Sequence, residues 1–177
     1  MSNKKSSDNN QIILGFDFGL KQIGLAVGQT LTQSARPLTV FKAKDGKPQW
    51  HEIEAQLAEW KPDYLVVGLP LNMDGTESDM SVRARKFANR LHGRFGCVVE
   101  LCDERLSSAE AKSQLAEGRA VARHDASAEA AEQYGQAMSR NKRDGTVDAI
   151  AAQLIVQLYF DLRLKSIQSV KIEGYNI

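Results

Sequence analysis

Acidic residues that could bind a metal ion follow two predicted strands and open the last predicted helix. Asp17 comes directly after one apolar stretch, and Asp103 and Glu104 come directly after another. Asp148 lies in the first turn of the helix, four residues after Asp144. Ligands of open α/β sheets gather near strand ends, so these carboxylates could converge on a hard cation such as Mg²⁺. Such cations clamp phosphodiesters and activate water, which makes a nuclease one hypothesis.

Each acid taken singly also has a structural explanation. Asp17 sits in a glycine-rich turn, where Asp is common for the turn itself. Asp148 complements the dipole of its helix without any metal. The spacing alone therefore leaves both explanations open, and the combination of three such positions carries the metal-site hypothesis.

A run of cations without a single acid lies within the predicted helix 79–95. Its stripe beside the apolar face consists of Arg83, Lys86, Arg90 and Arg94, with Arg85 elsewhere on the helix. A smaller cluster, Arg140, Lys142 and Arg143, precedes Asp148. Solvated helices usually mix their charges, so the stripe is a candidate phosphate-contact surface. An ordinary solvated basic face explains it equally well.

The histidines and cysteines indicate no further site. The histidines at 51, 92 and 124 are scattered and match no triad or metal spacing. Cys97 and Cys102 fall on opposite faces of a predicted strand, which excludes a disulfide between them. We expect both to be free structural thiols in a reducing cytosol.

The elements that must position these residues follow from periodicity and turn signals. Strands are predicted at 12–16, 22–28, 36–41, 64–68 and 97–102, with a turn cluster at 44–48. Helices are predicted around 53–60 and at 79–95, 107–117, 128–139 and 147–164. This order predicts an α/β fold with a mixed five-stranded sheet, three antiparallel strands followed by two parallel ones, flanked by helices.

Length and composition favour one globular domain. The chain has 177 residues, of which 42% are hydrophobic and 25% charged, with a net charge of +1. These values exclude disordered, collagen-like and membrane classes. We expect a frayed segment at 1–10, one domain at 11–164 and an irregular tail at 165–177. No secretion signal or membrane span is evident, so a cytoplasmic location is expected.

Four segments of the chain resemble the YqgF/RuvX family. They are GFDFG with KQIGLAVG at 15–28, PDYLVVGLPLNMDGT at 62–76, DERLSS at 103–108 and VDAIAA at 147–152. Together they follow the family's order over residues 11–163. The segment 118–143 looks longer than is usual in the family, and Asp144 to Val147 stand where a basic residue is common.

The resemblance implies a ribonuclease H-like fold, similar also to the resolvase RuvC, and a nuclease that matures the 5′ end of pre-16S rRNA. It implies Asp17, Glu104 and Asp148 as catalytic acids that bind Mg²⁺ or Mn²⁺, with Asp103 as a helper. We further expect Lys21 and Arg105 to contact nucleic acid, alongside the basic clusters at 83–94 and 140–143.

Three alternatives to an rRNA nuclease have different consequences. A resolvase of four-way DNA junctions would need a symmetric dimer, whereas the oligomeric state, monomer or dimer, is left open by the sequence. A non-catalytic nucleic-acid-binding module need not keep all three acids. A phosphotransferase of the actin type would need two such domains, which 177 residues cannot supply.

Overall fold

A six-stranded mixed sheet forms the centre of the part of the chain that the computed structural model describes, residues 10–106 and 146–173. Its order is β4–β3–β2–β1–β5–β6. The strands are β1 (Ile12–Asp17), β2 (Gln22–Gln29), β3 (Ser34–Lys44), β4 (Lys47–Pro48), β5 (Tyr64–Leu69) and β6 (Val99–Asp103). Strands β1 to β4 pair antiparallel in succession, whereas β5 runs parallel to β1, and β6 parallel to β5.

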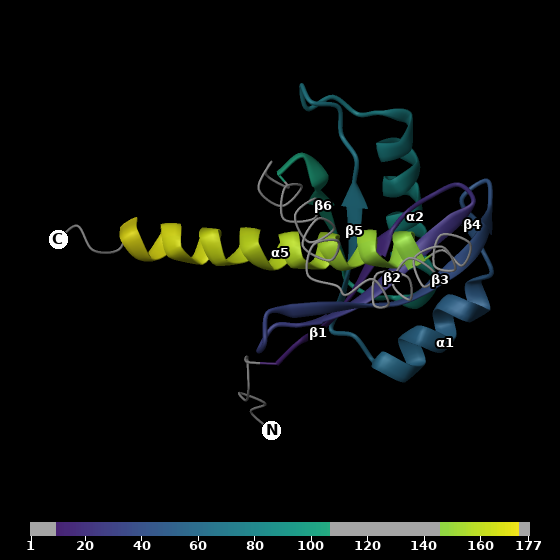
Figure 1. Ribbon diagram of the computed structural model, residues 1–177, viewed down its shortest axis with the longest axis horizontal. Helices are drawn as coiled ribbons and strands as arrows, with labels where there is room; N and C mark the ends of the chain where they lie inside the picture. Colours follow the sequence, from purple (N-terminus) through teal and green to yellow (C-terminus); the bar gives the residue numbers. More distant parts are fainter. Residues whose placement is uncertain (1–9, 107–145, 174–177) are drawn as a thin grey trace, which may run out of the picture.

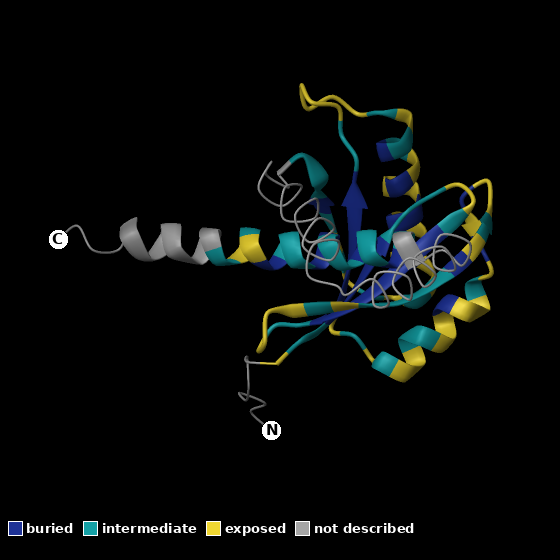
Figure 2. Ribbon diagram, in the orientation of Figure 1, coloured by how far each residue is buried: buried dark blue, intermediate teal, exposed yellow. Residues whose placement is uncertain are grey.

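Helices cover both faces of this sheet (Figure 1). They are α1 (Trp50–Trp60), α2 (Asp79–Phe95) and α5 (Thr146–Glu173), with a short 3₁₀ turn, η1 (Glu104–Leu106). Apolar side chains of α1 and α2 join one core cluster with the sheet, and those of α5 join another. Strand β5 is buried along its whole length between these layers (Figure 2).

Local sequence signals explain where α1 and α2 begin and end. The Ser78 hydroxyl accepts the Ser81 N–H at 3.0 Å and caps α2, and Gly96 ends that helix with a left-handed φ of 66°. Helix α1 ends at Trp60 and is capped by Lys61, whose φ is 46° and which directly precedes Pro62. The 3–4 periodicity of α2 buries Ala84, Phe87, Ala88 and Leu91 against the sheet.

Small residues let α5 approach the opposite face closely. A Cβ at Gly15 would stand 2.2 Å from Val156 Cγ2, and one at Gly28 would stand 2.5 Å from Val156 Cγ1. The Val156 side chain therefore packs against β1 and β2 in the space left free by the missing side chains of Gly15 and Gly28. Farther along α5, Phe160 is also buried against the sheet.

These observations confirm the predicted α/β fold, with a mixed sheet of antiparallel and then parallel strands flanked by helices, and they correct its details. The sheet has a sixth strand, β4, because the turn cluster closes a hairpin: β3 continues to Lys44, which pairs with Lys47. Asp45 and Gly46 take positive φ angles of 50° and 72°, as a two-residue hairpin turn requires. Strand β6 begins at Val99, two residues later than predicted, and α5 continues to Glu173 instead of ending near 164.

Other predictions have separate outcomes. The helices expected at 107–117 and 128–139 lie outside the described residues. Both thiols are free, with Cys102 buried and Cys97 partly buried just before β6. The limits of the domain at 11–164 stay a prediction. Among the described residues, no helix has the length and apolar character needed to cross a membrane.

Candidate active site

The candidate site lies where β1 ends, on the face of the sheet that α5 covers. Asp17 is the last residue of β1 and pairs with Gly24 of β2. In the parallel register Phe16 pairs with Val67, so Asp17 and Gly68 follow at the same level. The two strands beside Asp17 therefore each present a glycine at this level, and neither has a side chain to cover its carboxylate.

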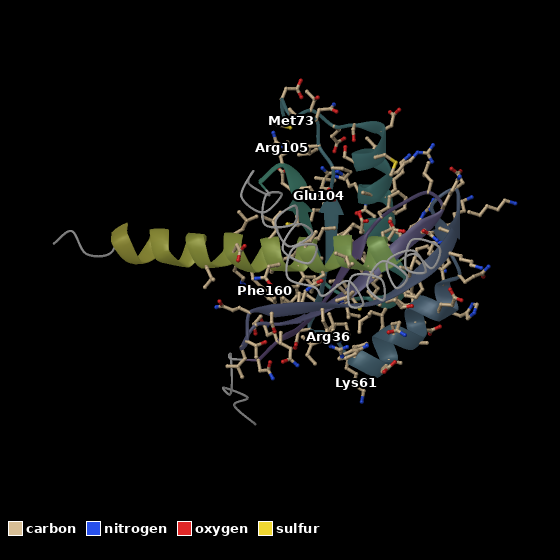
Figure 3. All side chains as sticks on the ribbon, viewed as in Figure 1. Arg36, Lys61, Met73, Glu104, Arg105 and Phe160 are labelled. Atoms are coloured by element: carbon tan, nitrogen blue, oxygen red, sulfur yellow. The ribbon has the colours of Figure 1, made fainter. Side chains whose placement is uncertain are left out.

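Gly68 provides the space that the Glu104 side chain occupies. Glu104 comes directly after β6, and its carboxylate extends back over β5. A Cβ at position 68 would stand 2.3 Å from Glu104 Oε1 and 2.5 Å from Ile155 Cδ1. Figure 3 labels Glu104 at this end of the sheet. The missing side chain at 68 is thus the condition for Glu104 to approach Asp17.

Gly24 has the same role for the start of α5. A Cβ at position 24 would stand 1.9 Å from the backbone oxygen of Asp148 and 2.9 Å from the N atom of Ala149. The first turn of α5 therefore lies directly on the backbone of β2. This close approach brings Asp148 beside the strand that pairs with Asp17.

The three carboxylates interact electrostatically. The pKa of Asp17 is raised from 3.8 to about 7, first by burial and then by the negative charges of Glu104 and Asp148. Both causes disfavour the ionised form of Asp17. A protonated Asp17 or a bound cation would relieve this repulsion, so the cluster has the electrostatics of a cation-binding or proton-exchanging site.

The donor set fits a hard divalent cation that is only partly coordinated by protein. All three side chains offer carboxylate oxygens, which Mg²⁺ and Mn²⁺ prefer. Within the described residues, no group of three or more His, Cys, Asp or Glu side chains is arranged so that it could hold a metal ion. Mg²⁺ is usually held by one or two carboxylates and completed by water and phosphate oxygens, which suits an open cluster of this kind.

Asp103, predicted as a helper of the three acids, is instead paired with Arg105. Its Oδ2 accepts from Arg105 Nη2 at 2.7 Å, and Arg105 Nε also donates to this carboxylate, at 3.1 Å to Oδ1. These bonds hold the pKa of Asp103 below its usual value. Arg105 Nη1 in turn lies 3.0 Å from the ideal Cβ position of Gly75, so the Asp103–Arg105 pair packs against the loop after β5.

That loop, residues 70–78, is held by its own hydrogen bonds at the same end of the sheet. The Gly75 N–H donates to the Asn72 carbonyl, and the Thr76 N–H donates to Asp74 Oδ1, both at 2.9 Å. Gly75 has a φ of 90°, which favours glycine. Figure 3 labels Arg105 between Glu104 and the loop that carries Met73.

The cations of α2 are exposed, as predicted, but they belong to the layer opposite the acids. Three of them already have partners: Arg83 pairs with Asp45 at 3.1 Å, Arg85 pairs with Glu77 at 2.7 Å, and Arg94 stacks over the Trp50 ring. Lys86 and Arg90 have no ion pair within the described residues. The helix starts near the acids, because it follows the loop after β5, and runs away from them.

The remaining predicted contacts divide into one described residue and several outside. Lys21 is exposed in the turn between β1 and β2, four residues after Asp17. Arg140, Lys142, Arg143 and the acid Asp144 lie outside the described residues.

The positioning glycines Gly24 and Gly68 were missed by the sequence analysis. Their signal is the strand period of two, which puts Gly24 on one face with Ala26 and Gly28.

Comparisons with known proteins identify the family of this chain. The model of the RuvX family, described as a Holliday junction resolvase, matches residues 11–131. A protein of Pectobacterium atrosepticum is 49% identical over 153 residues, which cover 86% of this chain and 97% of its own length. One of Shewanella denitrificans is 51% identical over 152 residues, covering 86% and 95%. Both carry the name "Putative pre-16S rRNA nuclease".

Solved structures with a similar chain course include the Thermus thermophilus RuvC in complex with a Holliday junction substrate. It has a TM-score of 0.45 and 18% identity and covers 88% of this chain and 96% of its own. The family match spans well over half of the 177 residues, and relatives near 50% identity extend over most of the chain. On these grounds the chain belongs to the RuvX family.

Proposed function

We propose that this protein is a metal-dependent nuclease that hydrolyses phosphodiester bonds, with Asp17, Glu104 and Asp148 as its catalytic acids. The observation that carries the proposal is the cluster itself. Two glycines admit Glu104 and Asp148 to the vicinity of Asp17, and the two charges together with burial raise the pKa of Asp17 to about 7. A fold gains no stability from crowding three acids, so a functional reason for the crowding is favoured.

The three carboxylates would hold Mg²⁺ or Mn²⁺, which neutralises phosphate charge and makes water a better nucleophile when bound. Asp17 is partly buried at the end of β1 and would keep bulk water from one side of the cluster. Glu104 and Asp148 reach the site from a 3₁₀ turn and a helix, so they can adjust to the substrate while Asp17 stays fixed on its strand.

The substrate we propose is an rRNA precursor, processed at its 5′ end. This rests on relatives near 50% identity that bear the name of pre-16S rRNA nucleases and match nearly their full length. Such a precursor would be met in the cytoplasm. Lys21 and Arg105 lie at the acidic end of the sheet and would contact the phosphates next to the scissile bond.

The cations of α2 would contact more distant parts of a folded RNA. Lys86 and Arg90 are the best placed of them, since Arg83, Arg85 and Arg94 are engaged within the protein. The cluster at 140–143 belongs to the same proposal, as the stretch of chain that leads into Asp148. Phosphate contacts of this kind give affinity and orientation without base specificity.

A second candidate function is resolution of four-way DNA junctions. The description of the matching family as a Holliday junction resolvase favours it. An enzyme that cuts two symmetric strands requires a dimer with two matched sites. A light-scattering mass of the protein with and without junction DNA tests this requirement directly.

The decisive experiment is cleavage of an end-labelled pre-16S rRNA 5′ leader in Mn²⁺, with wild-type protein and the Asp17→Asn variant side by side. We expect the wild type to cut and the variant to bind RNA without cutting. Cleavage that survives in Asp17→Asn would refute the assigned acids. A four-way DNA junction in the same assay ranks the two substrates. Equal binding with no cleavage by either protein would support a non-catalytic module.

A further inference from the structure

The hairpin of β3 and β4 places three lysines on one face of the sheet. Lys44 pairs with Lys47 across the turn, and Lys42 lies two residues before Lys44 on β3. Because side chains alternate along a strand, these three point to the same side. Ala43 packs towards the core of α1 and α2 on the other side. This hairpin was predicted only as a turn.

The lysines line an open hollow of about 500 Å³. Its lining consists of Val40, Lys42, Ala43, Lys44, Lys47, Gln49 and Glu52. Among the described residues no ion pair involves any of the three lysines, and Glu52 is the single acid in the lining. The nearest acid on the turn, Asp45, is already paired with Arg83. The hollow therefore keeps an excess of positive charge.

The three lysines of the hollow lie on the same face of the sheet as the acids, whereas Ala43 and the start of α1, with Gln49 and Glu52, border the hollow from the opposite layer. Asp17 pairs with Gly24, Gly24 pairs with Val40, and Gln22 in the next row pairs with Lys42. Two strand spacings separate β1 from β3, which amounts to about 10 Å between backbones. Figure 1 shows the hairpin beyond the amino-terminal end of α5, so this helix leaves it uncovered. The cations of α2, by contrast, lie in the opposite layer.

We propose that this lysine hollow binds the phosphodiester backbone of the substrate strand immediately beside the acidic cluster. The inference rests on the proposed nuclease function and extends it, because it gives the strand a path across β2 to the β3–β4 hairpin. Three flexible ammonium groups without an aromatic platform suit a repeated point charge such as phosphate. They carry no means of reading a base.

The test uses a fluorescent single-stranded RNA of about eight nucleotides, a length that one small domain can cover. Binding is measured by anisotropy at several salt concentrations in the uncleaving Asp17→Asn background. The test variant is Lys42→Gln/Lys44→Gln. The charge-matched control is Arg36→Gln/Lys61→Gln, at the opposite end of the sheet (Figure 3).

The hollow variant should bind about tenfold more weakly at low salt, with a salt slope reduced by about one to one and a half for two lost contacts. The control should stay within about twofold of the parent, because its two charges lie at the opposite end of the sheet. Lys42→Arg/Lys44→Arg should keep the affinity, which shows that charge is what matters.

Two results would overturn the inference in distinguishable ways. In the first, the parent binds the RNA and the wild type cleaves it, while the hollow variant binds like the control. The lysine hollow then does not bind the substrate, and the proposed nuclease function is unaffected. If wild type neither binds nor cleaves RNA or junction DNA, the proposed function fails and the hollow fails with it. Thermal unfolding of each variant excludes a loss through misfolding.

Discussion

Asp17 couples the candidate site to the stability of the protein. Its pKa in the folded state is about 7, against 3.8 for an ordinary Asp. The folded protein therefore holds this proton more tightly than the unfolded chain does. Consequently the free energy of unfolding should decrease as pH rises from about 4 to about 7, by on the order of 4 kcal/mol at about 1.4 kcal/mol per pH unit.

The amide of the Asp17→Asn variant does not titrate. Position 17 should therefore not lower the stability of the variant over that pH range. Denaturant unfolding of both proteins at pH 5 and pH 8 measures the difference. We expect the free energy of unfolding of the variant, relative to that of the wild type, to increase as pH rises. An equal pH dependence in the two proteins would show that Asp17 is not the group responsible.

Gly68 is the residue on which the position of Glu104 depends. In Gly68→Ala the new methyl would stand 2.3 Å from Glu104 Oε1, so the carboxylate must move. Displacement of a catalytic group by about 1 Å can cost up to a hundredfold in rate, so we expect a loss of about tenfold or more in cleavage. The measurement is the single-turnover rate on the RNA leader.

Gly93→Ala is the matched control for this substitution. Gly93 lies on α2, and a Cβ there would meet no atom within 4 Å. Replacing an exposed helical glycine with alanine should stabilise the protein by about 0.5–1 kcal/mol and leave cleavage unchanged. If Gly68→Ala cleaves as fast as Gly93→Ala, the space at position 68 is not what positions Glu104.

At the scale of elements, the pair Asp103–Arg105 joins β6 to the loop at 70–78. The guanidinium lies against Gly75, whose N–H donates to the Asn72 carbonyl. Removal of the guanidinium in Arg105→Gln should loosen the loop, so amide hydrogen exchange at Gly75 and Thr76 should accelerate. Arg85→Gln removes the same charge from the pair with Glu77 and is the control. Equal exchange in both variants would contradict a supporting role for Arg105.

The sequence predicts elements well where the pattern is long. The apolar spacing of α2 and the continuous apolar run of β5 identify a helix and a buried strand with their faces. A two-residue strand such as β4 cannot be told from a turn, because its lysines match both. The pairing of Asp103 with Arg105 is equally hidden, since adjacent acids at a strand end look alike until the alternation of side chains is fixed.

The meeting of the three acids depends on register, which the sequence leaves open. Their place after strands and at a helix start is visible, and it predicts that they lie near one another. What brings Glu104 and Asp148 close to Asp17 is the alignment of Gly24 and Gly68 with Asp17 across three strands. A slip of one residue in β5 would turn Gly68 to the other face and fill the site with a side chain.

For the whole molecule, the near-zero net charge conceals a separation of charges. Three acids lie near one another on the α5 face. Lysines that form no ion pair within the described residues flank them on the hairpin, and further cations line α2 in the opposite layer. Steering of nucleic acid then depends on these local fields. The acids alone would repel a phosphodiester, so a cation and the flanking lysines must together make the site attractive to substrate.

This arrangement predicts that divalent cations stabilise the folded protein through the acidic cluster. A ligand at a hundred times its dissociation constant that binds only the folded state adds about 2.7 kcal/mol. We expect saturating Mg²⁺ or Mn²⁺ at pH 8 to raise the melting temperature of the wild type, where Asp17 is ionised and the repulsion is greatest. Asp17→Asn should respond much less, because one ligand and much of the repulsion are gone.

The control is Glu54→Gln, which removes an exposed acid on α1 and should respond like the wild type. An equal rise in all three proteins would mean that the cation binds elsewhere. The three acids could then no longer be assigned as its ligands in the proposed mechanism.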